Sequence, residues 1–318
     1  GKVFRSGDLK QDRVKAAIDF AAERGIQYVH MDAGWYGPEM KMSSDATTVS
    51  PDKDLDIPAL CKYAESKGIG LMVYVNQRAL VQQLDTFVQI GNQRWSTWLH
   101  DAVRKCGEYG LMVDIHDEYR PTGFSRTYPN LMTQEGIRGN EEMPDATHNM
   151  TLPFTRYLAG AGDYTLCYFN NRVKNTKAHQ LAMAAVYYSP LQFMFWYDRP
   201  EFYQGEEELE FWKAIPSVWD DSRALDGEIG EYIVQARRSG NDWFVGAMTN
   251  TEARTITLTT DFLEPGKKYM LHLYEDDDKL NTRTKVRSTH KKIKAGDKLV
   301  LKLKASGGAA LHFTPLKK

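Results

Sequence analysis

The sequence predicts an α/β protein in which a parallel (β/α)8 TIM-like barrel precedes a small antiparallel β-sandwich. Two observations carry this prediction. Up to about residue 228, short strand-like runs alternate with amphipathic helical patterns, which is typical of βα units that build a parallel sheet. Beyond that point, short strands follow one another between Gly, Asn and Asp turns, which is typical of a sandwich. We therefore expect a barrel over residues 1–228 and an all-β domain over residues 229–318.

The barrel units follow one another in a regular order. A first strand opens near Val3-Phe4, and a helical pattern over residues 11–24 leads through Gly25 into the buried run IQYVHMDAGWYG, whose strand ends at Asp32. Further helices are expected at 55–67, 93–109 and 174–187, and further strands at 69–75, 111–115 and 191–196. An open doubly wound sheet is the alternative, but no G-x-G-x-x-G fingerprint follows the first strand.

The unit after the third strand looks too short. Between Val75 and Gln93 the chain must supply a helix, a strand and a loop, but only the runs RALVQQLD and TFVQIG are available. A crossover connection alone needs about 10–12 residues. We therefore expect this unit to be shortened, or residues to be missing near Asp85–Phe87.

The C-terminal domain is expected to hold about seven short strands. Six of them are visible as alternating runs: EYIVQARR, WFVGAMTN, TITLTT, KYMLHLY, KLVLKLKA and AALHFTP. We expect this domain to pack on the barrel and to have a structural role.

The composition argues against several kinds of partner. Lys and Arg number 41 against 42 Asp and Glu, so the formal net charge of −1 gives no basic excess for phosphate binding. The most apolar stretch, residues 182–197, is interrupted by Pro190 and is shorter than the roughly 20 apolar residues of a membrane span. The first residues, GKVFRSGDLK, lack a signal-peptide pattern. We expect no nucleic-acid partner and no membrane span.

The densest group of polar residues lies after the predicted strand 111–115 and in the next loop. Its acidic and histidine members are Asp114, His116, Asp117, Glu118, Glu135, Glu141 and Glu142. Converging carboxyl groups can act as a general acid and base, or they can bind a hard cation such as Ca²⁺. The sequence contains no HExxH zinc motif, no G-x-S-x-G elbow and no P-loop, which argues against the commonest zinc protease, serine hydrolase and NTPase sites.

The motifs around this group carry a family resemblance. The run HDEYRPTGFSRTYPNLMTQEGIRGNE, with YVHMDAGWYG before it and LPFTRYLAGAGDYT after it, resembles glycoside hydrolase family 97, the calcium-dependent α-glucosidases and α-galactosidases. The resemblance implies an exo-acting α-glycosidase that releases a terminal hexose from an oligosaccharide, a Ca²⁺ cofactor and a periplasmic location. It also implies an N-terminal β domain before the barrel, and we expect this domain to be missing from a chain that opens at the barrel.

The resemblance assigns roles to the polar group by motif. Glu141 of R-G-N-E falls where the family has its general acid, and Glu135 of Q-E-G falls at a calcium-ligand position. Asp117 occupies the place of a base carboxylate that also touches calcium, so Glu135, Glu141 and Asp117 are the expected metal ligands. His116 resembles a sugar-hydroxyl contact. An inverting pair of carboxyl groups stands about 6.5–9.5 Å apart.

Further residues are expected to line the substrate pocket. They follow predicted strands or the G-A-G turn, and they are Asp32, Trp35, Asn76 and Asp163. We prefer an inverting α-glucosidase-type enzyme. A retaining α-galactosidase is the alternative, although the position expected for its Asp nucleophile offers Thr86. A third possibility is a degenerate barrel that binds carbohydrate without turnover, because Asn76-Gln77 stand where inverting members have a base carboxylate.

Overall fold

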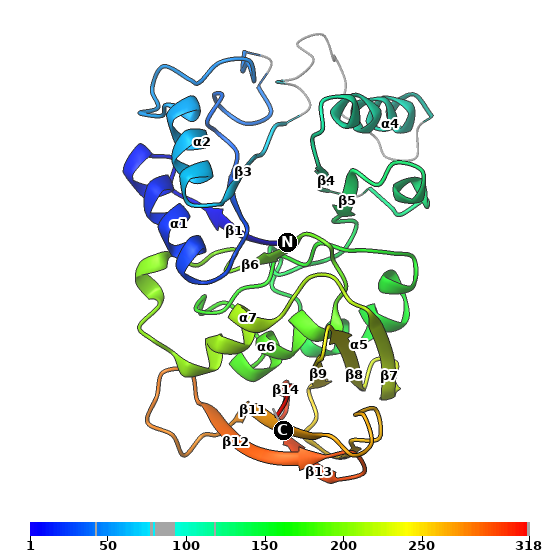
Figure 1. Ribbon diagram of the computed structural model, residues 1–318. Helices are drawn as coiled ribbons and strands as arrows, with labels where there is room; N and C mark the ends of the chain where they lie inside the picture. The colour runs from blue at the N-terminus through cyan, green and yellow to red at the C-terminus, as the bar shows by residue number, and fades with distance from the viewer. Residues whose placement is uncertain (42, 77–78, 80–92, 118, 317–318) are drawn as a thin grey trace.

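The computed structural model describes residues 1–41, 43–76, 79, 93–117 and 119–316 (Figure 1). Its N-terminal part contains short parallel strands, each preceded or followed by helices. The strands are β1 (Lys2–Ser6), β2 (Tyr28–Met31), β3 (Gly70–Val73), β4 (Val113–Ile115), β5 (Leu131–Gln134) and β6 (Gln192–Met194). They pair in the orders β3-β2-β1-β6 and β4-β5, and every one of these pairings is parallel.

An extended segment around residues 163–168 joins the two sheets into a barrel wall. The Asp163 N–H donates to the Gln134 carbonyl at 3.1 Å, and the Leu166 N–H donates to the Phe193 carbonyl at 3.2 Å. The wall therefore runs from β4 through β5 and this segment to β6, β1, β2 and β3. The expected barrel is confirmed. The expected short unit, with Gln77, Thr86 and the stretch near Asp85–Phe87, lies outside the described residues.

The helices form where the apolar spacing predicts them. Buried side chains on one face anchor α1, and the helix ends before Gly25, whose φ of 64° a residue with a side chain rarely adopts. In α2 the Asp56 carboxylate accepts the Ala59 N–H, and Pro58 occupies the first turn. The bounds are α1 (Gln11–Glu23), α2 (Ile57–Ser66), α4 (Gln93–Glu108), α5 (Ala146–Thr151), α6 (Lys177–Val186) and α7 (Glu210–Ala214). Within the described ranges, no helix is long and apolar enough to cross a bilayer.

The C-terminal domain is an antiparallel sandwich, as expected. Its larger sheet has the order β12-β11-β14-β9-β8-β7, and β10 pairs with β13 in a second layer. A separate apolar core, which includes Trp243, Leu271 and Phe313, fills the space between the layers. The bounds are β7 (Asp221–Glu228), β8 (Tyr232–Ser239), β9 (Asp242–Thr249), β10 (Arg254–Thr259), β11 (Lys268–Asp276), β12 (Val286–Lys294), β13 (Lys298–Leu303) and β14 (Gly308–Pro315).

Two of these strands were not expected from the sequence. Strands β7 and β12 are the two edges of the larger sheet, and most of their side chains are exposed. Edge strands lack the apolar alternation by which inner strands are predicted. Strand β7 precedes residue 229, so the antiparallel sheet begins before the division expected at 228/229.

Helix α6 lies between the barrel and the larger sheet (Figure 1). Every residue from Ala178 to Val186 is buried. The sheet approaches this helix at two glycines: a Cβ atom on Gly246 would lie 2.4 Å from the Ala182 carbonyl oxygen, and one on Gly308 would lie 2.8 Å from the His179 Cα. Only glycine allows such a close backbone approach, so α6 is part of the barrel and of the C-terminal domain at once.

His179 sits inside this contact. Its Nδ1 lies 3.0 Å from the Gly307 carbonyl and donates to it, and Asn149 Nδ2 lies 3.4 Å from its Nε2. Burial lowers the pKa of His179 to about 4, although the Gly307 carbonyl acts in the opposite direction. The folded protein therefore holds a neutral imidazole that protonates more readily in the unfolded chain.

Acid is expected to weaken folding through His179. Because its folded pKa is lowered, the stabilisation is complete above the unfolded pKa and declines as the pH falls from about 6.5 toward about 4. Between pH 7 and pH 5 this single group should remove about 2 kcal/mol from the free energy of unfolding. Urea titrations of wild type and His179→Gln at both pH values measure the effect. Equal losses in the two proteins would contradict it.

Candidate active site

Polar side chains gather at the carboxyl ends of the barrel strands. The most distant two are 191 positions apart in the chain. They meet because parallel barrel strands all end at the same face. The members are Arg5 from β1, His30 from β2, Asp32 directly after β2, Asp114 from β4, His116 directly after β4, Glu135 and Glu141 from the loop after β5, Asp163 at the start of the 163–168 segment, and Trp196 after β6.

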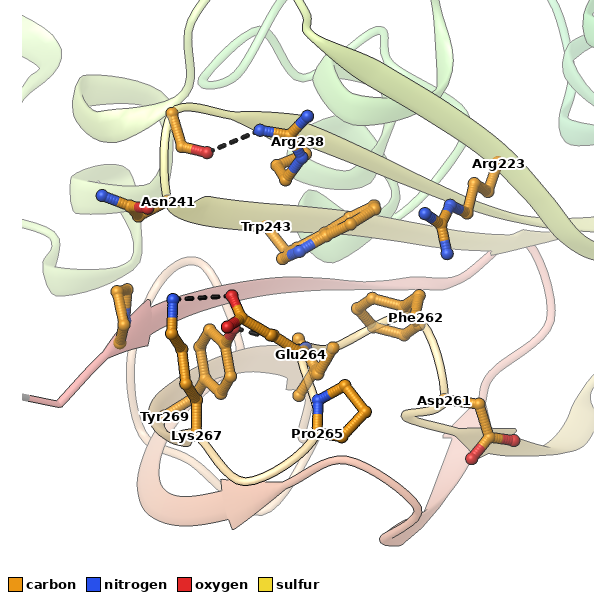
Figure 2. A pocket seen from close by; sticks show the side chains of 13 residues that line it. Arg223, Arg238, Asn241, Trp243, Asp261, Phe262, Glu264, Pro265, Lys267 and Tyr269 are labelled. Carbon is orange, nitrogen blue, oxygen red and sulfur yellow. Dashed lines mark hydrogen bonds and ion pairs between the residues drawn. The ribbon is translucent and has the colours of Figure 1, made fainter.

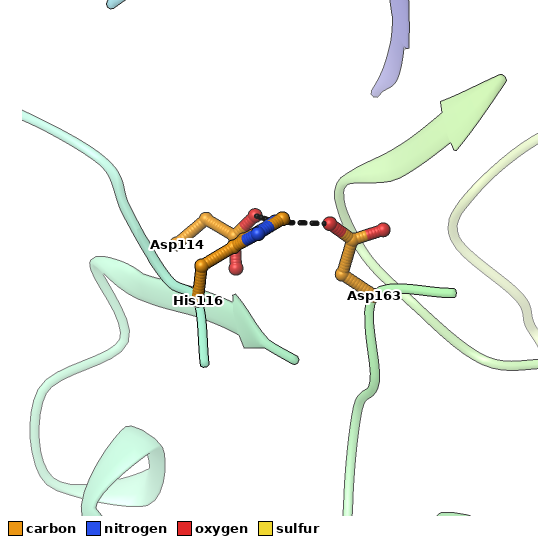
Figure 3. Close-up of side chains that lie close together, drawn as sticks. All are labelled: Asp114, His116 and Asp163. Atoms are coloured by element: carbon orange, nitrogen blue, oxygen red, sulfur yellow. Dashed lines mark hydrogen bonds and ion pairs between the residues drawn. The ribbon is translucent and has the colours of Figure 1, made fainter. Parts of the chain in front are cut away.

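His116 lies at the centre of this group. Its Nε2 is 2.8 Å from Asp163 Oδ2 and 3.6 Å from Asp114 Oδ2, while its Nδ1 is 3.6 Å from Glu135 Oε2 (Figure 3). Burial lowers the pKa of His116, but the Asp163 hydrogen bond and the charge of Asp114 outweigh burial and raise this pKa well above its ordinary value. The ring is therefore an imidazolium that donates to Asp163.

The two aspartates beside His116 are buried. The Asp163 side chain is fully shielded from solvent, and its Oδ1 accepts the Thr165 N–H at 3.0 Å. Within the described part of the chain, neither Asp114 oxygen has a hydrogen-bond partner. Burial, and then the Asp163 charge, raise the pKa of Asp114 well above its ordinary value. Asp163 thus holds the His116 ring in its orientation and does not face solvent. The raised pKa of Asp114 favours its protonated, neutral form.

The two glutamates lie on the other side of His116. Burial raises the pKa of Glu135 to about 7, and burial, followed by the charge of Asp163, also raises the pKa of Glu141. A carboxyl group with a raised pKa can keep its proton near neutrality, as a general acid must. The Glu135 carboxylate also accepts the Asp117 N–H at 2.6 Å, which ties the end of β4 to the end of β5.

Arg5, His30 and Trp196 border the group on the side of β1 and β2, and we call these three residues the wall. Arg5 forms an ion pair with Asp32 and lies 5.0 Å from the Trp196 ring centroid. The rings of His30 and His116 both stack on Trp196, at 5.8 and 5.6 Å between centroids. Burial lowers the pKa of His30 to about 3, so this ring is neutral.

The structure brings together only some of the residues that the sequence predicts for the site. His116, Glu135, Glu141 and Asp163 share one cluster, and Asp32 adjoins it. Trp35 lies in the barrel core, where its Nε1 donates to the Tyr74 carbonyl at 2.7 Å. Asn76 is buried beside Tyr36, whose hydroxyl accepts its backbone N–H at 2.9 Å. Their substrate-binding roles stay predictions.

Asp117 occupies a special backbone position. Its φ of 68° is unusual for a residue other than glycine, and its carbonyl accepts the Gly136 N–H at 2.9 Å. Asp117 is exposed, unlike the buried carboxyl groups around His116. The Asp117 backbone therefore connects the end of β4 to the loop after β5. The Asp117 side chain is accessible to water.

Sequence reasoning missed three members of the wall, Arg5, His30 and Trp196. A signal for the first two existed, because each is a polar residue that directly follows a buried apolar residue within its strand. Trp196 stands in the aromatic run that follows β6, where its composition predicts a core residue. Only the ring closure of the barrel brings Trp196 next to His116.

The cluster suits a cation. Ligand atoms of His116, Glu135 and Glu141 lie within 4.8 Å of one another, as do those of Asp114, His116 and Asp163. Five carboxyl groups of the group (Asp32, Asp114, Glu135, Glu141 and Asp163) face two cationic side chains, Arg5 and His116. This excess of acid, with two glutamates side by side, fits the oxygen-rich coordination of Ca²⁺.

A second hollow lies in the C-terminal domain, away from this cluster (Figure 2). Its volume is about 390 Å³, and Trp243, Phe262 and Tyr269 contribute to its lining. Several charged side chains around it are paired: Lys267 contacts Glu264 at 2.6 Å, and Arg223 contacts Asp221 at 2.8 Å. It lacks the converging acids of the barrel, so the chemistry places the candidate active site at the strand ends.

A barrel with paired acids at its strand ends, followed by an antiparallel domain, is the architecture of a barrel-type glycoside hydrolase. Comparisons with known proteins specify the family. The family model described as glycoside hydrolase 97 matches residues 2–93 and 86–137, and the one described as glycosyl-hydrolase 97 C-terminal, oligomerisation, matches residues 218–314. The chain belongs to glycoside hydrolase family 97.

Individual relatives agree with this membership. A retaining alpha-galactosidase from Bacteroides thetaiotaomicron is 32% identical over 94% of this chain and 50% of its own length. A family 97 enzyme from Pseudoalteromonas sp. strain K8, solved with acarbose, is 28% identical with a TM-score of 0.88, over 100% of this chain and 60% of its own. A β-arabinopyranosidase at 23% identity and a TM-score of 0.74, over 98% of this chain and 55% of its own, shares the fold. The chain spans about half the length of the curated relatives it matches.

Proposed function

We propose that the chain forms the catalytic part of an exo-acting α-glycoside hydrolase that releases a terminal α-linked hexose from an oligosaccharide. The observation that carries this proposal is the half-buried Glu141 carboxyl group, with its raised pKa, in the acid-rich cluster at the strand ends. A periplasmic location, where oligosaccharide substrates are available, is part of the same proposal.

The residues divide the chemistry between them. Glu141 gives its proton to the glycosidic oxygen as the bond from that oxygen to the anomeric carbon breaks. The Asp117 carboxylate accepts a proton from the water that attacks the anomeric carbon from the opposite face, which inverts the anomer. His116, held by Asp163, donates from its imidazolium to a sugar hydroxyl, and Trp196 supports that ring from behind.

Calcium belongs to the same proposal. Glu135 would hold the ion through its carboxylate, with Asp117 at the edge of the site. Glu141 must keep its proton to act as the acid, so it would offer the ion at most its carbonyl oxygen. The remaining oxygen ligands would come from water or substrate. The bound ion would neutralise the acidic excess and orient oxygen atoms of the substrate. His116 offers nitrogen, which Ca²⁺ disfavours, so its task is the sugar and not the ion.

A retaining α-galactosidase is the second candidate, and the name of the Bacteroides relative favours it. That mechanism needs a carboxylate nucleophile, which the sequence does not offer in the run TFVQIG, outside the described residues. The two candidates differ in the anomer of the first sugar released. Proton NMR of that sugar distinguishes them: the β-anomer indicates inversion and the α-anomer indicates retention.

The first test is hexose release from maltose and from melibiose, with added Ca²⁺ and with a chelator. We expect release from one of the two disaccharides and at least a tenfold loss of rate on chelation, because the acid cluster loses its neutralising charge. Circular dichroism in both conditions checks that the fold is retained. If the folded protein bound both disaccharides and released hexose from neither, the proposal of hydrolysis would be wrong, and the chain would be a carbohydrate-binding barrel.

A further inference from the structure

Three histidines form a row across the larger sheet of the C-terminal domain. His290 of β12 stands directly opposite His272 of β11, which in turn stands directly opposite His312 of β14. Residues opposite one another on neighbouring strands project from the same face of a sheet. The ring centroids of His272 lie 4.5 Å from those of His290 and 5.7 Å from those of His312.

Nitrogen atoms in this row are available for a ligand. Among the described residues, none forms a hydrogen bond with the His272 ring. The nearest acid to His290 is Glu207, 3.7 Å from its Nε2, and the His290 side chain is 45% exposed. His312 Nε2 pairs with Asp242 Oδ2 at 2.9 Å, which leaves Nδ1 free and fixes the ring orientation. A carboxylate behind an imidazole is the usual support of a metal-binding histidine.

The protonation state of the row also suits a metal. Burial, and then the neighbouring His290 and His312, lower the pKa of His272, and burial lowers the pKa of His312 despite Asp242. Neutral imidazoles bind Zn²⁺, Cu²⁺ and Ni²⁺, whereas Ca²⁺ prefers oxygen. Two acidic side chains contact the row, Asp242 at His312 and Glu207 at His290, while Lys292 lies two residues from His290 on the same face of β12.

We propose that His272 and His290, with His312 as a third ligand, form a site for a divalent transition-metal ion, separate from the acid cluster of the barrel. In the described part of the chain, the ring nitrogens of His272, His290 and His312 do not all lie within 4.8 Å of one another. The His272 and His290 rings must therefore rotate about their side-chain bonds to face one ion. The exposed His290 is free to do so. The ion would connect three adjacent strands next to Glu207, which belongs to the barrel part of the chain.

Equilibrium dialysis of the untagged protein with Zn²⁺, in excess Ca²⁺, tests the site. We expect one Zn²⁺ per chain that is lost in His272→Gln/His290→Gln, with at least a tenfold weaker affinity in either single variant. His148→Gln, outside the row, is the matched control and should bind as wild type. Glu135→Gln/Glu141→Gln should also retain this Zn²⁺, which separates the row from the barrel cluster.

A second measurement keeps the result independent of variant folding. Cu²⁺ added to the wild-type protein should give an electron paramagnetic resonance spectrum with hyperfine splitting from two or three imidazole nitrogens, and Zn²⁺ should raise the thermal midpoint. Zn²⁺ binding that survives in the double variant, a spectrum without imidazole splitting, or an unchanged midpoint would each overturn the proposal.

Discussion

Glu141→Gln is expected to lower kcat on an unactivated disaccharide by about 10²–10⁴-fold, the range in which general acid catalysis contributes. Glutamine keeps the size of the side chain and removes the proton that must reach the leaving oxygen. The loss should be much smaller on a 4-nitrophenyl glycoside, because that leaving group departs without protonation. This difference separates an acid from a residue that only binds metal or sugar.

The adjacent Glu142 provides the control. It is exposed and pairs with Arg138 at 2.9 Å on the surface, so Glu142→Gln should retain wild-type kinetics on both substrates. Initial rates for wild type and both variants, at saturating Ca²⁺, are sufficient. Equal losses on the two substrates in Glu141→Gln would mean that Glu141 is not the acid, and full activity would remove it from the site.

Trp212→Ala is expected to cost about 3–5 kcal/mol of unfolding free energy, as large aromatic-to-alanine changes in a core do. Trp212 is 1% exposed and packs edge-on against Phe195 and Tyr168, at 4.9 and 5.4 Å between ring centroids. Its Nε1 also donates to the Leu181 carbonyl of α6 at 3.4 Å. Truncation therefore leaves a cavity and removes a side-chain hydrogen bond where α7 meets α6.

Chemical denaturation of the variant and wild type measures this cost. Tyr109→Ala is the comparison, because Tyr109 is 72% exposed, and its truncation should change the free energy of unfolding by less than about 0.5 kcal/mol. A similar, small change in both variants would show that the barrel core does not depend on Trp212.

The sequence predicts the fold well where hydrophobic periodicity is strong. Helices α1, α2, α4 and α6 and the inner strands of the sandwich lie within a few residues of their expected ranges, because each buries apolar side chains. The edge strands β7 and β12 escape prediction because solvent, not a core, faces most of their side chains. Hydrophobic periodicity in a sequence reflects the burial of one face of an element, and an edge strand buries few side chains.

The candidate site is predictable to the extent that its members share one stretch of chain. His116, Glu135 and Glu141 lie within a single motif-bearing segment, and the structure places their ligand atoms together. Arg5, His30 and Trp196 come from the two ends of the barrel, and only ring closure makes them neighbours. Their contribution depends on which strands are adjacent, and no local pattern carries that information.

The close approach at Gly246 and Gly308 makes the two domains energetically inseparable. Helix α6 packs on the barrel with one side and on the larger sheet with the other. Separating the two domains would therefore expose buried residues of α6 to solvent. The boundary near residue 228 therefore marks a change in the pattern of secondary structure. It does not mark a place where the protein unfolds separately on its two sides. Heat should melt the barrel and the sandwich in one step, and neither half is a module that recombination could exchange alone.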